Sequence, residues 1–307
     1  MPRPIVMDCD PGIDDAAALV CAILEPQLDL KLVTTVAGNV SVEKTTQNAL
    51  KIAEFVGSDV PVAAGAAQPL LKPFEDAARV HGESGLAGYD FPSPTRQPLT
   101  QTAVQALHST IMTASEPLTL VATGAYTNIA LLLREYPEVK SHIKQIVAMG
   151  GSLSGGNMTS VAEFNVFTDP DAAQIMYHAG IPIVTVGLDV TGKALVTPAR
   201  VKSLAQTNRV GAMLAALINH YGDGSRKGRP MHDVNTICYL MHPEFYTTKD
   251  YWVDVQTSGP AIGALVADTR GAYHGDRTNA KVCLDIDAAA FNDWFLAEVQ
   301  RAERHSE

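Results

Sequence analysis

The chain has 307 residues, 46% of them hydrophobic, and its 33 acidic residues outnumber 23 basic ones to give a net charge of −10. This length and apolar content suffice for one large α/β domain with a substantial core. No cluster of lysines and arginines exists, which argues against binding to a nucleic-acid backbone. No run of 18 apolar residues could cross a membrane, and no secretory signal opens the chain, so we expect a cytoplasmic protein.

Short apolar runs alternate with helical patterns along the chain. We predict strands at residues 5–7, 30–36, 60–63, 118–122, 145–149, 183–186, 252–257, 264–267 and 281–285. We predict helices at residues 15–24, 42–56, 102–114, 128–136, 170–179, 198–205, 211–220, 233–241 and 288–304. The alternation predicts an α/β fold with an open, mostly parallel (mixed) sheet and helices on both faces, in a single domain spanning residues 1–307.

Local signals support several of these boundaries. Ser41 precedes one predicted helix, and Asp169-Pro170 precedes another, as N-terminal signals do. Gly57 is a plausible helix end. The four cysteines (Cys9, Cys21, Cys238 and Cys283) lie far apart in apolar surroundings, so we expect buried free thiols in a reducing compartment.

Polar clusters follow many of the predicted strands directly. They lie at residues 8–15, 37–39, 123–124, 150–151 and 189. Ligands of open parallel sheets bind at the carboxyl ends of the strands. The sequence therefore places its candidate site along one edge of the sheet.

The most informative of these clusters is DCDPGIDD, which carries Asp8, Asp10, Asp14 and Asp15 within eight residues. Four carboxylates at the end of a buried strand repel one another, so they need protons or a cation. A hard divalent cation with oxygen ligands fits best. An EF-hand loop is excluded, because Ile13 stands where that loop needs glycine. An acidic turn with only a structural role is the alternative.

DCDPGIDD resembles the N-terminal signature D-x-D-P-G-x-D-D of the inosine-uridine preferring nucleoside hydrolases and matches its six fixed positions. Further segments resemble that family in the same order, at residues 34–49, 80–88, 123–133, 149–157, 162–173, 187–191 and 231–237. The nearest resemblance is to ribonucleoside hydrolases that accept both purine and pyrimidine bases. It implies a Rossmann-like nucleoside hydrolase fold, a small-molecule ribonucleoside substrate, a role in nucleoside salvage, and a homodimer or homotetramer.

The resemblance also implies a role for each matching residue. Ca²⁺ would be held by Asp10, Asp15, Asp233 and the main-chain carbonyl of Thr123. Asp10 would also activate a metal-bound water, and Asp8 would contact the metal-binding residues without touching the metal itself. The ribose 2′- and 3′-hydroxyls would be held by Asp14, Asn39, Asn165 and Asp233, and the 5′-hydroxyl by Asn157 and Glu163. Met149 and Phe164 would line the sugar pocket, with His81 and His232 near the base.

Such groups suit the cleavage of an N-glycosidic bond, which passes through an oxocarbenium-like sugar. A bound cation lowers the pKa of water, and Asp10 as general base would contribute roughly 10²–10⁴-fold. Carboxylates stabilise the positive charge that develops on the sugar. Groups built around the ribose hydroxyls would explain rejection of 2′-deoxy substrates.

Several residues have a structural alternative. Glu163 and Asn165 are two apart, so in an extended segment both would face the pocket; the alternative is a loop before a helix. Asp233 could be a helix cap, and the proton for the leaving base could come from His232, His81, Tyr221 or water. We interpret Asp169 as a cap and Asp189 as a structural acid.

Two segments carry further expectations. Ala125-Tyr126 stands where the family usually has Pro and Leu, so the loop after Thr123 loses a restriction on φ. The polar stretch at 221–229 before His232 could be a lid that closes over the substrate, or an ordinary exposed loop.

Two other functions compete with a ribonucleoside hydrolase. A metal-dependent phosphohydrolase of the haloacid dehalogenase type also has D-x-D after its first strand, but Gly12 stands where Thr or Val is usual. No Lys or Ser/Thr pattern for phosphate capture supports it. A non-catalytic nucleoside-binding protein would be expected to lack Asp10 or a ribose contact, and none is missing.

Overall fold

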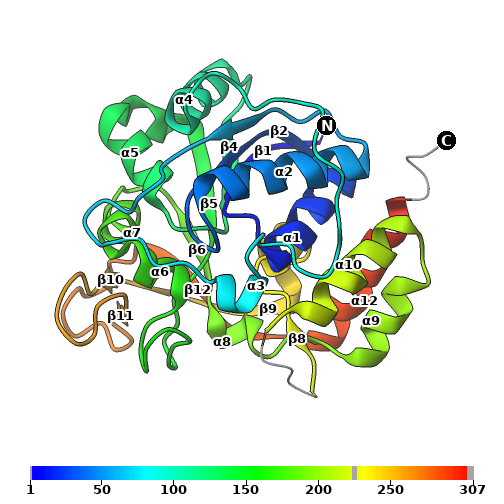
Figure 1. Ribbon diagram of the computed structural model, residues 1–307. Coiled ribbons are helices and arrows are strands. Elements are labelled where there is room, and N and C mark those ends of the chain that lie inside the picture. The colour runs from blue at the N-terminus through cyan, green and yellow to red at the C-terminus, as the bar shows by residue number, and fades with distance from the viewer. Residues whose placement is uncertain (1, 223–226, 303–307) are drawn as a thin grey trace.

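The computed structural model describes residues 2–222 and 227–302, and an open sheet forms their centre (Figure 1). In this part of the chain the sheet has eight strands in the order β3-β2-β1-β4-β5-β6-β12-β9. All neighbours are parallel except β12 and β9. The strands are β1 (Arg3–Cys9), β2 (Leu28–Thr35), β3 (Val62–Ala64), β4 (Leu118–Ala122), β5 (Ile143–Met149), β6 (Ile183–Val186), β9 (Tyr246–Tyr251) and β12 (Ala280–Ile286). The predicted mostly parallel sheet is confirmed.

Helices cover both faces of this sheet (Figure 1). One face is packed by α1 (Ile13–Leu24), α2 (Val42–Val56), α9 (Pro198–Ala205), α10 (Arg209–His220), α11 (Val234–Met241) and α12 (Ala288–Gln300). The other is packed by α4 (Ala103–Thr113), α5 (Thr127–Glu135), α7 (Pro170–Tyr177) and the 3₁₀ turn η1 (Pro137–His142). None of the helices within the described residues could span a membrane.

β1 and α1 lie at the centre of the molecule and carry the acidic motif. β1 lies between β2 and β4, and its Ile5, Val6 and Met7 are completely buried. It is buried on both faces, which explains its continuous apolar run. α1 begins at Ile13, two residues earlier than predicted, so Asp14 and Asp15 lie in its first turn. There the positive end of the helix dipole favours negative side chains.

Three short helices that the sequence did not reveal lie near the carboxyl ends of the strands. They are α3 (Ala78–His81), α6 (Phe164–Thr168) and α8 (Leu188–Thr191). Each has only four or five residues, too few to show a helical period. They hold three segments that the sequence had marked as candidate site segments.

The predicted strands near residues 252 and 264 do not belong to the main sheet. They are β10 (Val253–Val255) and β11 (Leu265–Ala267), which pair with each other in an antiparallel ribbon. A second small ribbon joins β7 (Leu195–Val196) to β8 (Arg229–Pro230), and a 3₁₀ turn, η2 (Pro243–Phe245), precedes β9. β9 itself was not predicted, because its sequence YTTKDY has no apolar run.

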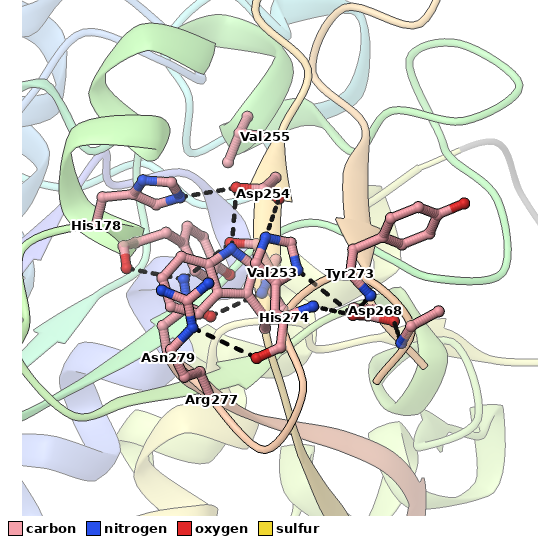
Figure 2. Close-up of polar contacts among 12 residues, drawn as sticks. His178, Val253, Asp254, Val255, Asp268, Tyr273, His274, Arg277 and Asn279 are labelled. Atoms are coloured by element: carbon pink, nitrogen blue, oxygen red, sulfur yellow. Dashed lines mark hydrogen bonds and ion pairs between the residues drawn. The ribbon is translucent and has the colours of Figure 1, made fainter. Parts of the chain in front are cut away.

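β10 and β11 belong to an excursion of the chain, residues 252–279, between β9 and β12. A polar network fixes this excursion (Figure 2). The carboxylate of Asp254 lies 2.9 Å from Nε2 of His178 and 3.9 Å from Nε2 of His274. Asp268 accepts hydrogen bonds from the backbone amides of Tyr273 and His274 at 2.9 Å. The excursion also packs against the segment that follows β5. Leu265 of β11 lies so close to Gly151 there that a Cβ on Gly151 would be 2.1 Å from its side chain.

The predicted boundary signals are confirmed where the structure describes them. Ser41 is the N-cap residue of α2, and Gly57 ends that helix with a φ of 82°, in the left-handed region that favours glycine. All four cysteines are free and buried. The predicted last helix extends to residue 304, and its final two residues lie outside the described part of the chain.

Candidate active site

A cavity of about 320 Å³ opens at the carboxyl ends of the strands. Predicted site residues on its wall are Asp14, Asn39, His81, Thr123, Met149, Asn157, Glu163, Phe164, Asn165, His232 and Asp233. The two remaining ones, Asp10 and Asp15, are completely buried and hydrogen-bond to the wall residues Asn39 and Thr123. The fold therefore brings all the predicted residues to one place.

Three buried carboxylates meet beside this cavity. Oxygens of Asp14, Asp15 and Asp233, the acidic cluster, lie within 4.8 Å of one another. Burial, followed by the charge of Asp15, raises the pKa of Asp14 to about 7. Burial also raises the pKa of Asp15, and burial and the neighbouring acids raise that of Asp233 far above its ordinary value. The cluster therefore resists carrying three negative charges without a counter-ion.

Asp10 adds a fourth carboxylate to this region. Its Oδ2 accepts a hydrogen bond from the backbone amide of Asn39 at 2.7 Å, and its backbone amide lies 3.3 Å from Oδ1 of Asp15. Its buried Oδ1 has no hydrogen-bond partner among the described residues. The neighbouring glycines make room for it, because a Cβ on Gly38 would lie 2.0 Å from its Oδ2 and one on Gly124 3.0 Å from Oδ1.

These residues fit a divalent cation with a preference for oxygen ligands. The acidic cluster offers three carboxylates, and the unpartnered Oδ1 of Asp10 needs a positive partner to offset the cost of its burial. Carboxylate and carbonyl oxygens are the ligands of hard cations such as Ca²⁺ and Mg²⁺. The structure thus supports a metal-binding acidic site beside the cavity.

Asn165 joins the ends of two strands. Its Nδ2 donates to the carbonyl of Thr123 at 2.7 Å and to that of Met149 at 3.2 Å. The prediction that Glu163 and Asn165 lie in an extended segment was wrong, because α6 begins at Phe164. Both residues nevertheless line the cavity, Glu163 as the N-cap and Asn165 from the first turn.

Glu163 is anchored by backbone amides. Its carboxylate accepts from the amide of Gly151 at 2.8 Å and that of Asn165 at 3.0 Å. Burial nevertheless raises its pKa to about 7, and these hydrogen bonds only partly oppose the shift. Nearby, Oδ1 of Asn157 accepts from the amide of Phe164 at 2.9 Å. Both residues thus contribute polar groups to the cavity wall.

Two histidines on the cavity wall are held in the neutral form. Nδ1 of His81 lies 3.0 Å from the backbone N–H of Ile13 and accepts from it, and burial lowers the His81 pKa to about 3. Nδ1 of His232 lies 2.6 Å from Oγ1 of Thr191, and burial lowers its pKa to about 4. The ring of Tyr221 contacts both histidine rings, and its hydroxyl donates to Oδ2 of Asp14 at 3.1 Å.

The structure decides some of the structural alternatives. Asp233 is the N-cap residue of α11, but its side chain makes no cap hydrogen bond and joins the acidic cluster instead. Asp169 does cap α7 through the amide of Ala172, as predicted. Asp189 accepts from the amide of Leu153 at 2.8 Å, which is the structural role expected of it.

A family model described as inosine-uridine preferring nucleoside hydrolase matches residues 5–293. The chain belongs to this family. It is 51% identical over 297 residues, 96% of either chain, to proteins named non-specific ribonucleoside hydrolase RihC from Salmonella newport and Salmonella typhi. Among solved structures, a purine-preferring ribonucleoside hydrolase from Gardnerella vaginalis superposes with a TM-score of 0.93 at 29% identity, covering 98% of this chain and 100% of the other. A plant nucleoside hydrolase superposes with a TM-score of 0.91 at 29% identity, covering 98% and 99%.

In this nucleoside hydrolase, residues that the sequence did not single out also contact the candidate site residues. Asn128 donates to Oδ1 of Asp8 at 2.8 Å, and burial raises the Asp8 pKa to about 7. Thr191 contacts His232, and Arg79 and Met158 line the cavity. Their partners are distant in sequence, so no local motif reveals them. The expected lid at 221–229 includes residues 223–226, which lie outside the described part of the chain.

Proposed function

We propose that this enzyme hydrolyses the N-glycosidic bond of purine and pyrimidine ribonucleosides, with Ca²⁺ as cofactor, to give free base and ribose. The observation that carries the proposal is the buried acidic cluster with Asp10, next to a cavity whose wall also holds amides and two neutral histidines. The volume of about 320 Å³ falls at the lower end of the range for small-molecule sites.

Asp10 acts as the general base in this proposal. A Ca²⁺ ion held by Asp10, Asp15, Asp233 and the Thr123 carbonyl would lower the pKa of water and offset the charge of the carboxylates. Asp10 takes a proton from the attacking water, and the neighbouring carboxylates stabilise the positive charge that develops on the sugar.

The sugar is oriented by the amides and acids of the wall. Asp14, Asn39, Asn165 and Asp233 hold the 2′- and 3′-hydroxyls, while Asn157 and Glu163 hold the 5′-hydroxyl. Both hydrogens of the Asn165 amide are engaged by carbonyls, so its Oδ1 is the atom that accepts from a ribose hydroxyl. A 2′-deoxyribonucleoside would leave such buried groups unpaired and is rejected.

The base lies toward the histidines. His232 is the proposed route of the proton to the leaving base; because its ring is neutral in the free enzyme, it must first take that proton from solvent. His81 contacts the base, with Met149 and Phe164 packing against the sugar. The Salmonella relatives named as non-specific ribonucleoside hydrolases support a broad choice of base.

We also propose that the chain is one domain, acts in nucleoside salvage in the cytoplasm and forms a homodimer or homotetramer. Analytical ultracentrifugation would measure this oligomeric state.

The test is ribose release from inosine, uridine, adenosine and cytidine by the wild type and by Asp10→Asn, with and without a chelator. We expect release by the wild type, loss of roughly 10²–10⁴-fold in kcat for the variant, and loss on chelation. Asp189→Asn serves as the control, because this acid lies off the cavity wall and asparagine can still accept from Leu153.

Two outcomes would replace the proposal. Failure to release ribose from any nucleoside while Ca²⁺ still binds would favour a nucleoside-binding protein. Release of inorganic phosphate from a phosphomonoester, without ribose release from nucleosides, would favour the phosphohydrolase.

A further inference from the structure

Tyr126 is a completely buried tyrosine in the loop that follows β4. It lies three residues after Thr123 and is the N-cap residue of α5. It does not line the cavity. Its hydroxyl crosses to the neighbouring strand and donates to the carbonyl of Met149, the last residue of β5, at 2.7 Å.

This hydrogen bond closes a bridge between the ends of β4 and β5. The Met149 carbonyl accepts from Tyr126 and also from Nδ2 of Asn165, which in turn donates to the Thr123 carbonyl at 2.7 Å. Thr123 is linked back to Tyr126 through the backbone. A single hydroxyl therefore helps set the position of a wall carbonyl and of the amide between the two strands.

The backbone beside this hydroxyl is shaped around it. A Cβ on Gly150 would lie 2.0 Å from Oη of Tyr126 and 3.3 Å from Oε2 of Glu163. Gly150 has a φ of 158°, which side-chain-bearing residues rarely adopt. The Tyr126 hydroxyl thus occupies the space that a side chain at position 150 would need, next to the Glu163 carboxylate that caps α6.

We infer that Tyr126 is a positioning residue for ribose and metal binding. This inference rests on the proposed function, because the groups it positions are the ribose-binding amide of Asn165 and the metal-binding carbonyl of Thr123. With the Tyr126 hydroxyl in place, the Met149 carbonyl has a partner of its own, so Asn165 keeps its shorter bond to Thr123. Without it, Asn165 is the one remaining donor to Met149 among the described hydrogen bonds, and its amide shifts away from Thr123.

The test compares Tyr126→Phe with Tyr177→Phe. Tyr177 is equally buried, belongs to the same core cluster and spends its hydroxyl on Thr185 at 2.8 Å, away from the cavity. For Tyr126→Phe we expect KM for uridine and the Kd for CaCl₂, measured by calorimetry, each to rise about tenfold, while kcat changes less than about threefold. For Tyr177→Phe we expect both constants unchanged, although both variants lose thermal stability.

A double variant shows whether Tyr126 acts through the amide. If it does, Tyr126→Phe added to Asn165→Ala raises KM no further than Asn165→Ala alone, since residues of one network are not additive. Equal behaviour of Tyr126→Phe and Tyr177→Phe in KM and in Ca²⁺ affinity would overturn the inference while leaving ribose release by the wild type intact. Absence of ribose release by the wild type would instead overturn the proposed function.

Discussion

At the scale of single residues, the protein fixes the chemical form of its groups through contacts that a sequence does not show. The resemblance to the nucleoside hydrolases marked His81 as a candidate contact for the base. Its tautomer depends on the backbone N–H of Ile13, 68 residues earlier in the chain, which occupies Nδ1. The proton of the neutral ring must therefore be on Nε2, and His81 meets a ligand as a hydrogen-bond donor.

We predict that His81 stays neutral throughout the physiological range. Its folded-state pKa of about 3 lies below the ordinary 6.5, so the stabilisation from the neutral ring is complete above pH 6.5 and decreases as the pH falls toward 3. NMR of ¹⁵N-histidine-labelled protein should show the Nε2–H tautomer with no titration between pH 5 and pH 8. A His81 signal that titrates near 6.5 would contradict this.

At the scale of elements, sequence patterns predicted the long buried pieces and missed the short or half-exposed ones. β1 and α1 have runs of apolar residues long enough to identify them. α6 has five residues and is specified by a cap, since the carboxylate of Glu163 holds the amides of Asn165 and Val166. The sequence showed which side chains would matter there, but it predicted an extended backbone where a helix begins.

Asp169 caps α7 and can test whether this helix supports the site without binding the substrate. Its carboxylate accepts from the amides of Ala172 and Leu70 and from the hydroxyl of Thr127, so it ties α7 to two other segments. We expect Asp169→Ala to lower the free energy of unfolding by about 2–4 kcal/mol, because a cap is lost and buried donors are left unpaired. Urea unfolding measures this.

The same variant should keep its activity. At 25 °C and in the absence of urea, kcat/KM of Asp169→Ala for uridine should equal that of the wild type, since Asp169 does not line the cavity. A folded variant with strongly reduced kcat/KM would show that this acid belongs to the site.

At the scale of the whole molecule, the sheet gathers buried acids from segments far apart in sequence. The sequence predicted this convergence, because parallel strands end at one edge. It could not predict that Asp10 would lie just behind the cavity wall while Asp14 and Asp233 lie on it, since that depends on how Asn39 packs against Asp10.

With Ca²⁺ as the proposed cofactor, this convergence predicts that stability depends on the cation and on pH. The folded-state pKa of Asp14 is about 7, above its ordinary 3.8, so without a cation its contribution to stability is present below pH 3.8 and is lost as the pH rises through 7. In the proposed site, Ca²⁺ would have to displace protons from the acids at low pH and would relieve their repulsion at high pH. We expect saturating CaCl₂ to raise the thermal unfolding temperature more at pH 8 than at pH 6.

The size of that effect follows from mass action. At a Ca²⁺ concentration 100 times Kd the folded state gains about 2.7 kcal/mol. Each comparison pairs CaCl₂ with EDTA at the same pH, so the separate titration of the histidines cancels. A Ca²⁺ effect that is absent at pH 8, or larger at pH 6, would contradict a role for the acids as ligands.

The two outer strands of the sheet have a consequence for how the protein behaves in a crowded solution. β3 is only three residues long, and β9 carries the exposed Lys249 and Asp250 on a strand that pairs with β12 on one side. Short edges and charged edges discourage a strand of another chain from adding to the sheet. β9 was not predicted because its sequence is polar. The same polar sequence protects the sheet against aggregation through the edge that β9 forms.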